Sequence, residues 1–207
     1  SVQSEFRDAG YAYSDDGGSS WVFPGVLDPG VFRTYPVLGT DLDGNVYYYS
    51  QTTESDRYIA HLFKSADGGR TWSPKLYAYG GSKGWFDIDR TDSPSRGSIY
   101  ASWYPGGGCC DDAIFNRSLN GGAEFSVPVT IPSSPYFGTV AVGPNGDVFV
   151  AGLADHALVV ARSINAKDAT RKPTFPPAVE VDLGGTLEFG NPDHDSPNPG
   201  GEGSGAL

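Results

Sequence analysis

Carboxylates, arginines and aromatic residues gather in six polar stretches between the apolar runs of this 207-residue sequence. Aromatic faces stack on sugar rings, carboxylates bind hydroxyl groups, and arginines bind carboxylates through paired hydrogen bonds. This mixture predicts a carbohydrate ligand. The residues in these stretches are Asp28, Arg33, Tyr35, Glu54, Asp56, Arg57, Lys83, Trp85, Asp111, Asp112, Tyr136, Asp155 and His156.

The two cysteines, Cys109 and Cys110, are adjacent in one of these stretches. Neighbouring Cα atoms lie ~3.8 Å apart, below the usual disulfide range of ~4.4–6.8 Å, so a bridge between them is strained. The alternative is a free thiol pair that binds a soft metal, but the sequence has no third cysteine to help. We expect an oxidised pair that forms a rigid knob near the ligand.

A repeated motif shows which elements must position these residues. Residues 14–21 and 65–72 match at Ser, Asp, Gly-Gly, Ser/Thr and Trp, and residues 118–125 are a weaker copy with Asn120 and Phe125. A fourth, eroded copy begins at Ser163 and ends near Phe175. The copies begin about 50 residues apart, and self-similarity at such a period is typical of propellers and other repeat folds.

Four short β-rich runs accompany each complete repeat, as in a propeller blade. In the first complete repeat they cover residues 36–40, 44–49, 58–63 and 75–79. The next repeats have runs at 86–89, 97–102, 112–115 and 127–131, and at 138–142, 146–151, 157–161 and 178–182. Before them, residues 10–13 and 21–23 supply only the last two strands of a blade.

The motif itself predicts a folded turn rather than a catalytic or calcium site. Its Asp accepts hydrogen bonds from backbone N–H groups, its glycines allow positive φ, and its Trp covers the turn. The residues with this structural role are Ser14, Asp16, Gly18, Trp21, Ser65, Asp67, Gly69, Trp72, Ser118, Asn120, Gly122 and Phe125.

The pattern Ser-x-Asp-x-Gly-x-Ser/Thr-Trp at blade spacing resembles the Asp-box, or bacterial neuraminidase repeat, of the sialidase-like propellers. The resemblance covers almost the whole chain except its tail. It implies an all-β fold, a β-propeller of four-stranded antiparallel blades with Asp-box hairpins. We expect about three and a half blades of a six- or seven-bladed ring: a partial blade at 1–24, blades at 31–79, 85–131 and 136–183, and a loop at 184–207 leading to a missing blade. The alternative is that open halves assemble into an oligomer.

Propeller geometry sorts the loops onto two faces. The Asp boxes lie in the hairpins between third and fourth strands. The loops between second and third strands, and between blades, lie on the opposite face around the mouth of the central channel. Ligands usually bind where such loops converge. The polar stretches described first therefore share one face.

The resemblance implies narrow requirements for sialic acid hydrolysis: three arginines for the substrate carboxylate, a Tyr–Glu nucleophile pair and an acid/base Asp. Tyr35, Glu54 and Asp56 are the catalytic candidates. The candidate substrate-binding residues are Arg33, Arg57, Trp85, Asp111, Asp112, Tyr136, Asp155 and His156. The family's Arg-Ile-Pro signature is absent, Arg70 belongs to a box, and Arg117 and Arg162 flank box serines, so the sequence shows no complete triad.

Two main functions remain open. The first is a secreted exo-glycosidase that removes terminal sialic acid or related sugars from glycans. The second is a non-catalytic propeller of a secreted or cell-surface protein that binds a glycan or a protein, and a third is a purely structural blade array. The missing arginines favour the second.

Charge and composition limit the partners. A net charge of −11 disfavours nucleic acid and acidic membrane surfaces, and no apolar run reaches the ~18 residues of a membrane helix. We expect a carbohydrate ligand and the remaining blades of the parent chain as partners, with no cofactor and no metal. Without Met or a signal peptide, the sequence fits a processed or truncated product.

Three further residues have possible roles that we discount. His61 alternates within a β-rich run and is expected to pack. His194 could bind a metal with Asp193 and Asp195, but its surroundings favour a polar linker. Asn116 begins a formal glycosylation sequon inside tight structure.

Overall fold

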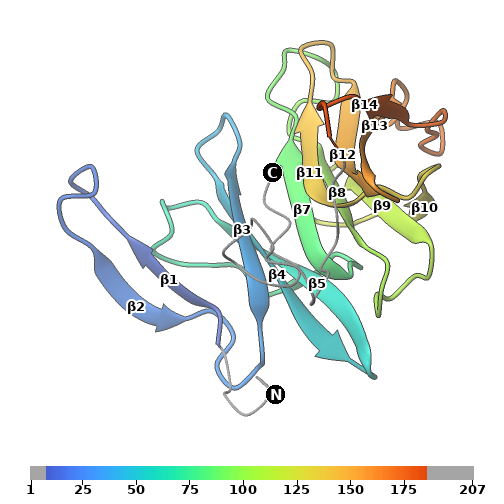
Figure 1. The fold of residues 1–207 in the computed structure, drawn as a ribbon. Coiled ribbons are helices and arrows are strands. Elements are labelled where there is room, and N and C mark those ends of the chain that lie inside the picture. The colour runs from blue at the N-terminus through green and yellow to red at the C-terminus, as the bar shows by residue number, and fades with distance from the viewer. Residues whose placement is uncertain (1–7, 186–207) are drawn as a thin grey trace.

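A computed structural model describes residues 8–185 of the chain (Figure 1). Every regular element in this part is a β-strand. The strands are β1 (Gly10–Tyr13), β2 (Val22–Val26), β3 (Thr34–Thr40), β4 (Val46–Glu54), β5 (Arg57–Ser65), β6 (Leu76–Tyr77), β7 (Ser82–Ile88), β8 (Ile99–Tyr104), β9 (Ala113–Ser118), β10 (Val129–Thr130), β11 (Tyr136–Val142), β12 (Val148–Ala154), β13 (Ala157–Ser163) and β14 (Val179–Val181). None of the described elements is a helix that could cross a membrane.

The strands form four successive antiparallel sheets in the described part of the chain. Three have four strands, in the orders β3-β4-β5-β6, β7-β8-β9-β10 and β11-β12-β13-β14, and β1-β2 forms a smaller sheet. The first strand β7 contacts the first strands β3 and β11 of the sheets on either side of it, so consecutive sheets pack face to face. Figure 1 shows β1-β2 at one end of this row and β11–β14 at the other. The predicted fold, a partial β-propeller of four-stranded blades, is confirmed.

The outer strands differ most from the prediction. The expected runs at 75–79 and 127–131 shrink to the two-residue strands β6 and β10. A proline precedes each of them, Pro74 and Pro128, and proline cannot donate to a sheet. β2 instead extends to Val26, beyond the predicted end of the partial blade. The tail from 186, including His194 with Asp193 and Asp195, lies outside the described residues.

The core lies between the sheets rather than on one side of each. β4 and β8 are buried along most of their length, because both of their faces are covered. Tyr47, Tyr49 and Tyr100 are among the largest fully buried side chains. Such continuous burial explains why β4 has aromatic residues at the consecutive positions 47–49 instead of an alternating pattern.

The first three Asp boxes form the same hydrogen-bonded turn, and the eroded fourth box keeps part of it. In the second box the Ser65 hydroxyl donates to Asp67 at 2.8 Å and accepts the Gly69 N–H, while Asp67 accepts the N–H and hydroxyl of Thr71. In the eroded fourth box, Asn165 accepts the N–H of Thr174 at 2.9 Å. These turns join third and fourth strands, as predicted, and their geometry supports a structural role.

The box aromatics pack against the preceding sheet. Trp72 lies 5.6 Å from the ring of Tyr11 in β1, and Phe175 lies 4.9 Å from Phe115 in β9. Trp21 lies over its turn as expected, 3.8 Å from where a Cβ on Gly18 would be, but it is 65% exposed, since no described sheet precedes β1-β2. The aromatic position of the box therefore joins blades rather than sealing the turn alone.

A matched pair of serine substitutions tests the turn. Ser118 is fully buried and its hydroxyl accepts the Gly122 N–H at 2.9 Å. Ser118→Ala should lower the free energy of unfolding by about 1–3 kcal/mol, because a buried donor loses its acceptor. Ser14→Ala, in the solvent-exposed first box, should cost less than about 1 kcal/mol because water can replace the hydroxyl. Denaturant unfolding of both variants measures the difference, and equal losses would contradict the prediction.

Candidate ligand site at the inner strands

The three inner strands carry the same backbone irregularity at their first residues. β3, β7 and β11 each show a register shift against the next strand, and in each the bulged residue has positive φ: 50° at Tyr35, 48° at Lys83 and 53° at Phe137. This conformation is rare for such side chains. Bulges and strained residues of this kind concentrate at functional sites.

Glycines follow two of the three bulged residues, at points where the inner strand lies close to a second strand. A Cβ on Gly84 would lie 2.7 Å from the ring of Tyr49, and one on Gly138 would lie 1.8 Å from the carbonyl oxygen of Ala151. No other residue fits either position without moving backbone or a buried ring. In β7 and β11 the bulge thus pairs a bulky residue with a following glycine, whereas in β3 Pro36 follows Tyr35.

The bulges bring a lysine between aromatic rings. The Lys83 Nζ lies 4.9 Å from the centroid of Phe137 and 5.9 Å from that of Tyr35. Tyr104, at the end of β8, packs on Phe137 at 4.6 Å and on Tyr136 at 5.5 Å. Partial burial lowers the pKa of Lys83. We call Tyr35, Lys83, Tyr104, Tyr136 and Phe137 the aromatic–lysine cluster.

The cluster borders a small cavity of about 10 Å³ between β7 and β11, enough for about one water, whose lining includes Lys83, Trp85, Tyr136 and Phe137. Tyr35 and Trp85 are also substantially exposed. Aromatic faces beside a partly desolvated ammonium can stack on a sugar ring and bind an anionic substituent. The prediction from sequence put Lys83 on this face but gave it no role, and its candidate residues did not include Tyr104 or Phe137. Aligning the three repeats would have found Lys83 and Phe137 at the register of Tyr35.

Arg33, a predicted substrate-binding residue, is buried in the structure. Its side chain is 0% exposed, and Nη2 donates to Asp28 at 2.6 Å. The same guanidinium contacts Ser50 and the Nδ1 of His61, both at 3.2 Å. Its charge also lies 4.9 Å from the ring of Phe63. Arg33 therefore fixes the segment before β3 to the strands β4 and β5 of the same sheet.

The catalytic candidates are not assembled into a catalytic group. Among the described residues, no hydrogen bond or ion pair joins Tyr35 to Glu54 or Asp56. Glu54 instead faces His61, with 3.7 Å between the carboxylate and Nε2. Asp56 is exposed in the β4–β5 turn with φ of 62°. His61 is buried beside Arg33, as its expected packing role requires.

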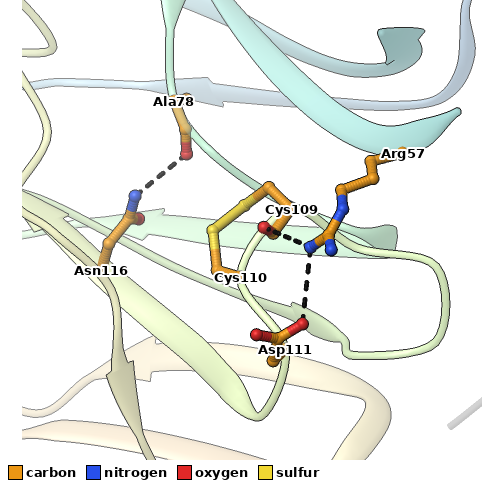
Figure 2. Close-up of a disulfide and its surroundings, with 6 residues drawn as sticks. All are labelled: Arg57, Ala78, Cys109, Cys110, Asp111 and Asn116. Carbon is orange, nitrogen blue, oxygen red and sulfur yellow. Dashed lines mark hydrogen bonds and ion pairs between the residues drawn. A yellow bond between two sulfur atoms is a disulfide. The ribbon is translucent and has the colours of Figure 1, made fainter. Parts of the chain in front are cut away.

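The disulfide between Cys109 and Cys110 is present, as predicted, with a Cα–Cα distance of 3.8 Å. Figure 2 shows Arg57 reaching across to this loop: its Nη1 donates to the Cys109 carbonyl at 2.9 Å and lies 3.4 Å from Asp111. Asn116 donates to the Ala78 carbonyl at 2.9 Å and is fully buried, which leaves its sequon inaccessible.

The remaining predicted residues are on exposed turns. Asp112 lies in the disulfide loop, and Asp155 and His156 form the turn between β12 and β13. Within residues 8–185 no three His, Cys, Asp or Glu side chains gather closely enough to hold a metal ion.

The comparisons with known proteins give distant structural neighbours. No protein-family model matches the chain, and no curated protein sequence matches it. It is similar to the intramolecular trans-sialidase from Ruminococcus gnavus, in complex with oseltamivir carboxylate, with 17% identity and a TM-score of 0.45 over 73% of this chain and 33% of that one. It is also similar to the Hadza microbial sialidase Hz136, with 16% identity and a TM-score of 0.48 over 83% of this chain and 36% of that one.

The chain thus spans about a third of the length of each neighbour. Both neighbours are sialidases, the class that the Asp boxes resemble. At such low sequence identity, the activity of one protein cannot be inferred from that of another. The propeller assignment rests on the topology of the chain's own sheets.

The buried His61 predicts a pH dependence of stability. Burial, and then the nearby Arg33, lower its pKa from 6.5 to about 4. The unfolded chain therefore binds a proton that the folded chain excludes, so stability is full above pH ~6.5 and falls as the pH drops towards 4. His61→Gln should show a shallower loss of melting temperature between pH 7.5 and 4. The matched variant His156→Gln, at an exposed position, should keep the wild-type slope; a wild-type slope in His61→Gln would contradict the assignment.

Proposed function

We propose that this chain is a non-hydrolytic, glycan-binding part of a sialidase-like propeller. The observation that carries the proposal is the convergence of Tyr35, Lys83 and Phe137 from three consecutive inner strands onto one cation–aromatic site. The rings offer stacking faces, and the Lys83 ammonium suits a carboxylate on an acidic sugar. Three sheets fix these side chains, so the ligand meets a rigid surface.

The placement of the arginines supports binding over hydrolysis. Arg33 is buried against Asp28, and Arg117 donates to the backbone carbonyls of Ala166 and Arg171. Arg70 and Arg162 pair with Asp15 and Asp147. Of the arginines predicted for the mouth face, Arg57 alone keeps an exposed side chain. Residues 8–185 therefore offer no arginine triad, and Tyr35 contacts Lys83 rather than an activating glutamate.

Further strands complete the ring in this proposal. Leu38 in β3 is 63% exposed, whereas Phe86 and Val140, at the same register in β7 and β11, are 4% and 3% exposed. A groove of about 450 Å³ lies beside Leu38 and is lined by Tyr11, Tyr48 and Trp72. An additional strand pair beside β1 would cover it, as β7 and β8 cover the equivalent face for β11. A secreted or cell-surface location belongs to the same proposal, since disulfides persist in oxidising compartments.

Binding and turnover assays test the proposal together. The wild-type chain should bind sialyllactose in titration calorimetry and release no fluorophore from a fluorogenic sialoside. Lys83→Gln should weaken sialyllactose binding at least tenfold, because the ammonium that receives the carboxylate is lost. Lys172→Gln makes the same charge change on the exposed Asp-box face and should leave the affinity unchanged.

Each result has a distinct consequence. Turnover of the sialoside by wild type would replace binding by hydrolysis as the function. Absence of binding to sialyllactose and to neutral lactose would remove the glycan hypothesis. Equal affinities of wild type and Lys83→Gln would move the site away from the aromatic–lysine cluster.

A further inference from the structure

The loop of residues 105–112 between β8 and β9 reaches onto the neighbouring sheet. The Gly107 carbonyl accepts the Tyr58 N–H at 2.7 Å, and the pair Tyr58–Gly108 forms a parallel β-bridge. The Cys109 N–H donates to the Gly80 carbonyl at 3.2 Å, and Arg57 donates to the Cys109 carbonyl. We call this set of contacts the clasp.

Every clasp contact lies within two residues of a bridged cysteine. Asp111, directly after Cys110, has φ of 51°, so the chain reverses sharply at the bridge. Both cysteines are half-buried, whereas Gly106, Gly107, Asp111 and Asp112 around them are exposed. A reagent can therefore approach the loop from solvent. Since the bridge closes the shortest possible loop, it constrains the unfolded chain very little, and its main effect is local.

The clasp is connected to the aromatic–lysine cluster by two short paths. Gly80, which accepts the Cys109 N–H, lies three residues before Lys83. A Cβ on Gly108 would lie 3.2 Å from the Cα of Gly81, so the loop packs tightly on the segment leading to Lys83. Tyr104 forms the other end of the loop and packs on Phe137. The position of the clasp thus affects two residues of the cluster, Lys83 and Tyr104.

We propose that the Cys109–Cys110 disulfide is a reversible thiol–disulfide exchange site whose reduction opens the clasp and weakens ligand binding at Lys83. The co-reactant is a dithiol. One of its thiolates attacks a protein sulfur and forms a mixed disulfide, and its second thiol then displaces the protein thiol. Two electrons pass to the protein, which gains two thiols, while the dithiol becomes a disulfide. The effect on ligand affinity rests on the proposed glycan-binding function; the opening of the clasp does not.

Hydrogen exchange of the folded full chain, before and after treatment with dithiothreitol, tests the opening. Thiol titration should find no free thiol before treatment and two afterwards. Exchange in peptides covering Tyr58 and residues 105–112 should become at least tenfold faster, because the amides of Tyr58 and Cys109 lose their acceptors. Exchange at Gly69 in the distant Asp box should stay the same, and the melting temperature should change little.

Two variants separate the bridge from the clasp. Cys109→Ser/Cys110→Ser should exchange like the reduced chain and should not respond to dithiothreitol. Arg57→Ala keeps the disulfide but loses its side-chain contacts to the loop, and should show a smaller increase. Unchanged exchange at Tyr58 in the reduced chain would overturn the proposal. Faster exchange throughout the chain would overturn it as well, because the bridge would then be a global stabiliser.

Binding of sialyllactose is measured separately in the two redox states. The reduced chain should bind at least tenfold more weakly, and re-oxidation should restore the affinity. Equal affinities with an opened clasp would overturn the coupling to Lys83. If neither state binds while exchange at Tyr58 still responds, the proposed function fails and the exchange site stands, so the two failures are distinguishable.

Discussion

The sheets that contain β4 and β8 are packed on both faces, and the first strand β7 lies beside the first strands β3 and β11. The close approach of β3 to β7 depends on a missing side chain. At Gly39 an added Cβ would lie 2.9 Å from the ring of Phe86 in the next sheet, so the glycine makes room for that ring. Because burial on both faces is the dominant stabilising term, the positions of glycines and large aromatics are set by the neighbouring sheet.

The same close approach produces the candidate site. Each inner strand begins with a bulge, and the bulge turns the side chains of Tyr35, Lys83 and Phe137 out of the regular pleat. A left-handed conformation costs free energy for such residues, so it persists only because packed sheets hold the strand on both sides. The site is therefore a by-product of blade packing that brings three successive repeats to one point. A ligand there would meet side chains already held in place.

The repeat made the fold predictable, while the individual partners of charged residues were not. Ser, Asp, Gly and Trp at fixed spacing report a local turn whose hydrogen bonds stay within a few residues, so the sequence contains the whole interaction. Adjacent cysteines are equally local, and their bridge was predicted. The burial of Arg33 depends on residues up to 28 positions away, among them His61. No local sequence pattern distinguishes a buried guanidinium from an exposed one. The positive φ of Lys83 runs against the usual preference of lysine and becomes visible only when the repeats are aligned.

The loops on the site face indicate where this propeller departs from its own repeat. The turns β4–β5 and β12–β13 have two residues each, and Ser55 and Asp56 both adopt positive φ, as tight hairpins require. The corresponding β8–β9 loop has eight residues, carries the disulfide and extends over the neighbouring sheet. Packing of the sheets explains the short turns without reference to a ligand. It does not explain a long loop fixed by a bridge and by Arg57, so this loop is the part of the site face that departs most from the repeat.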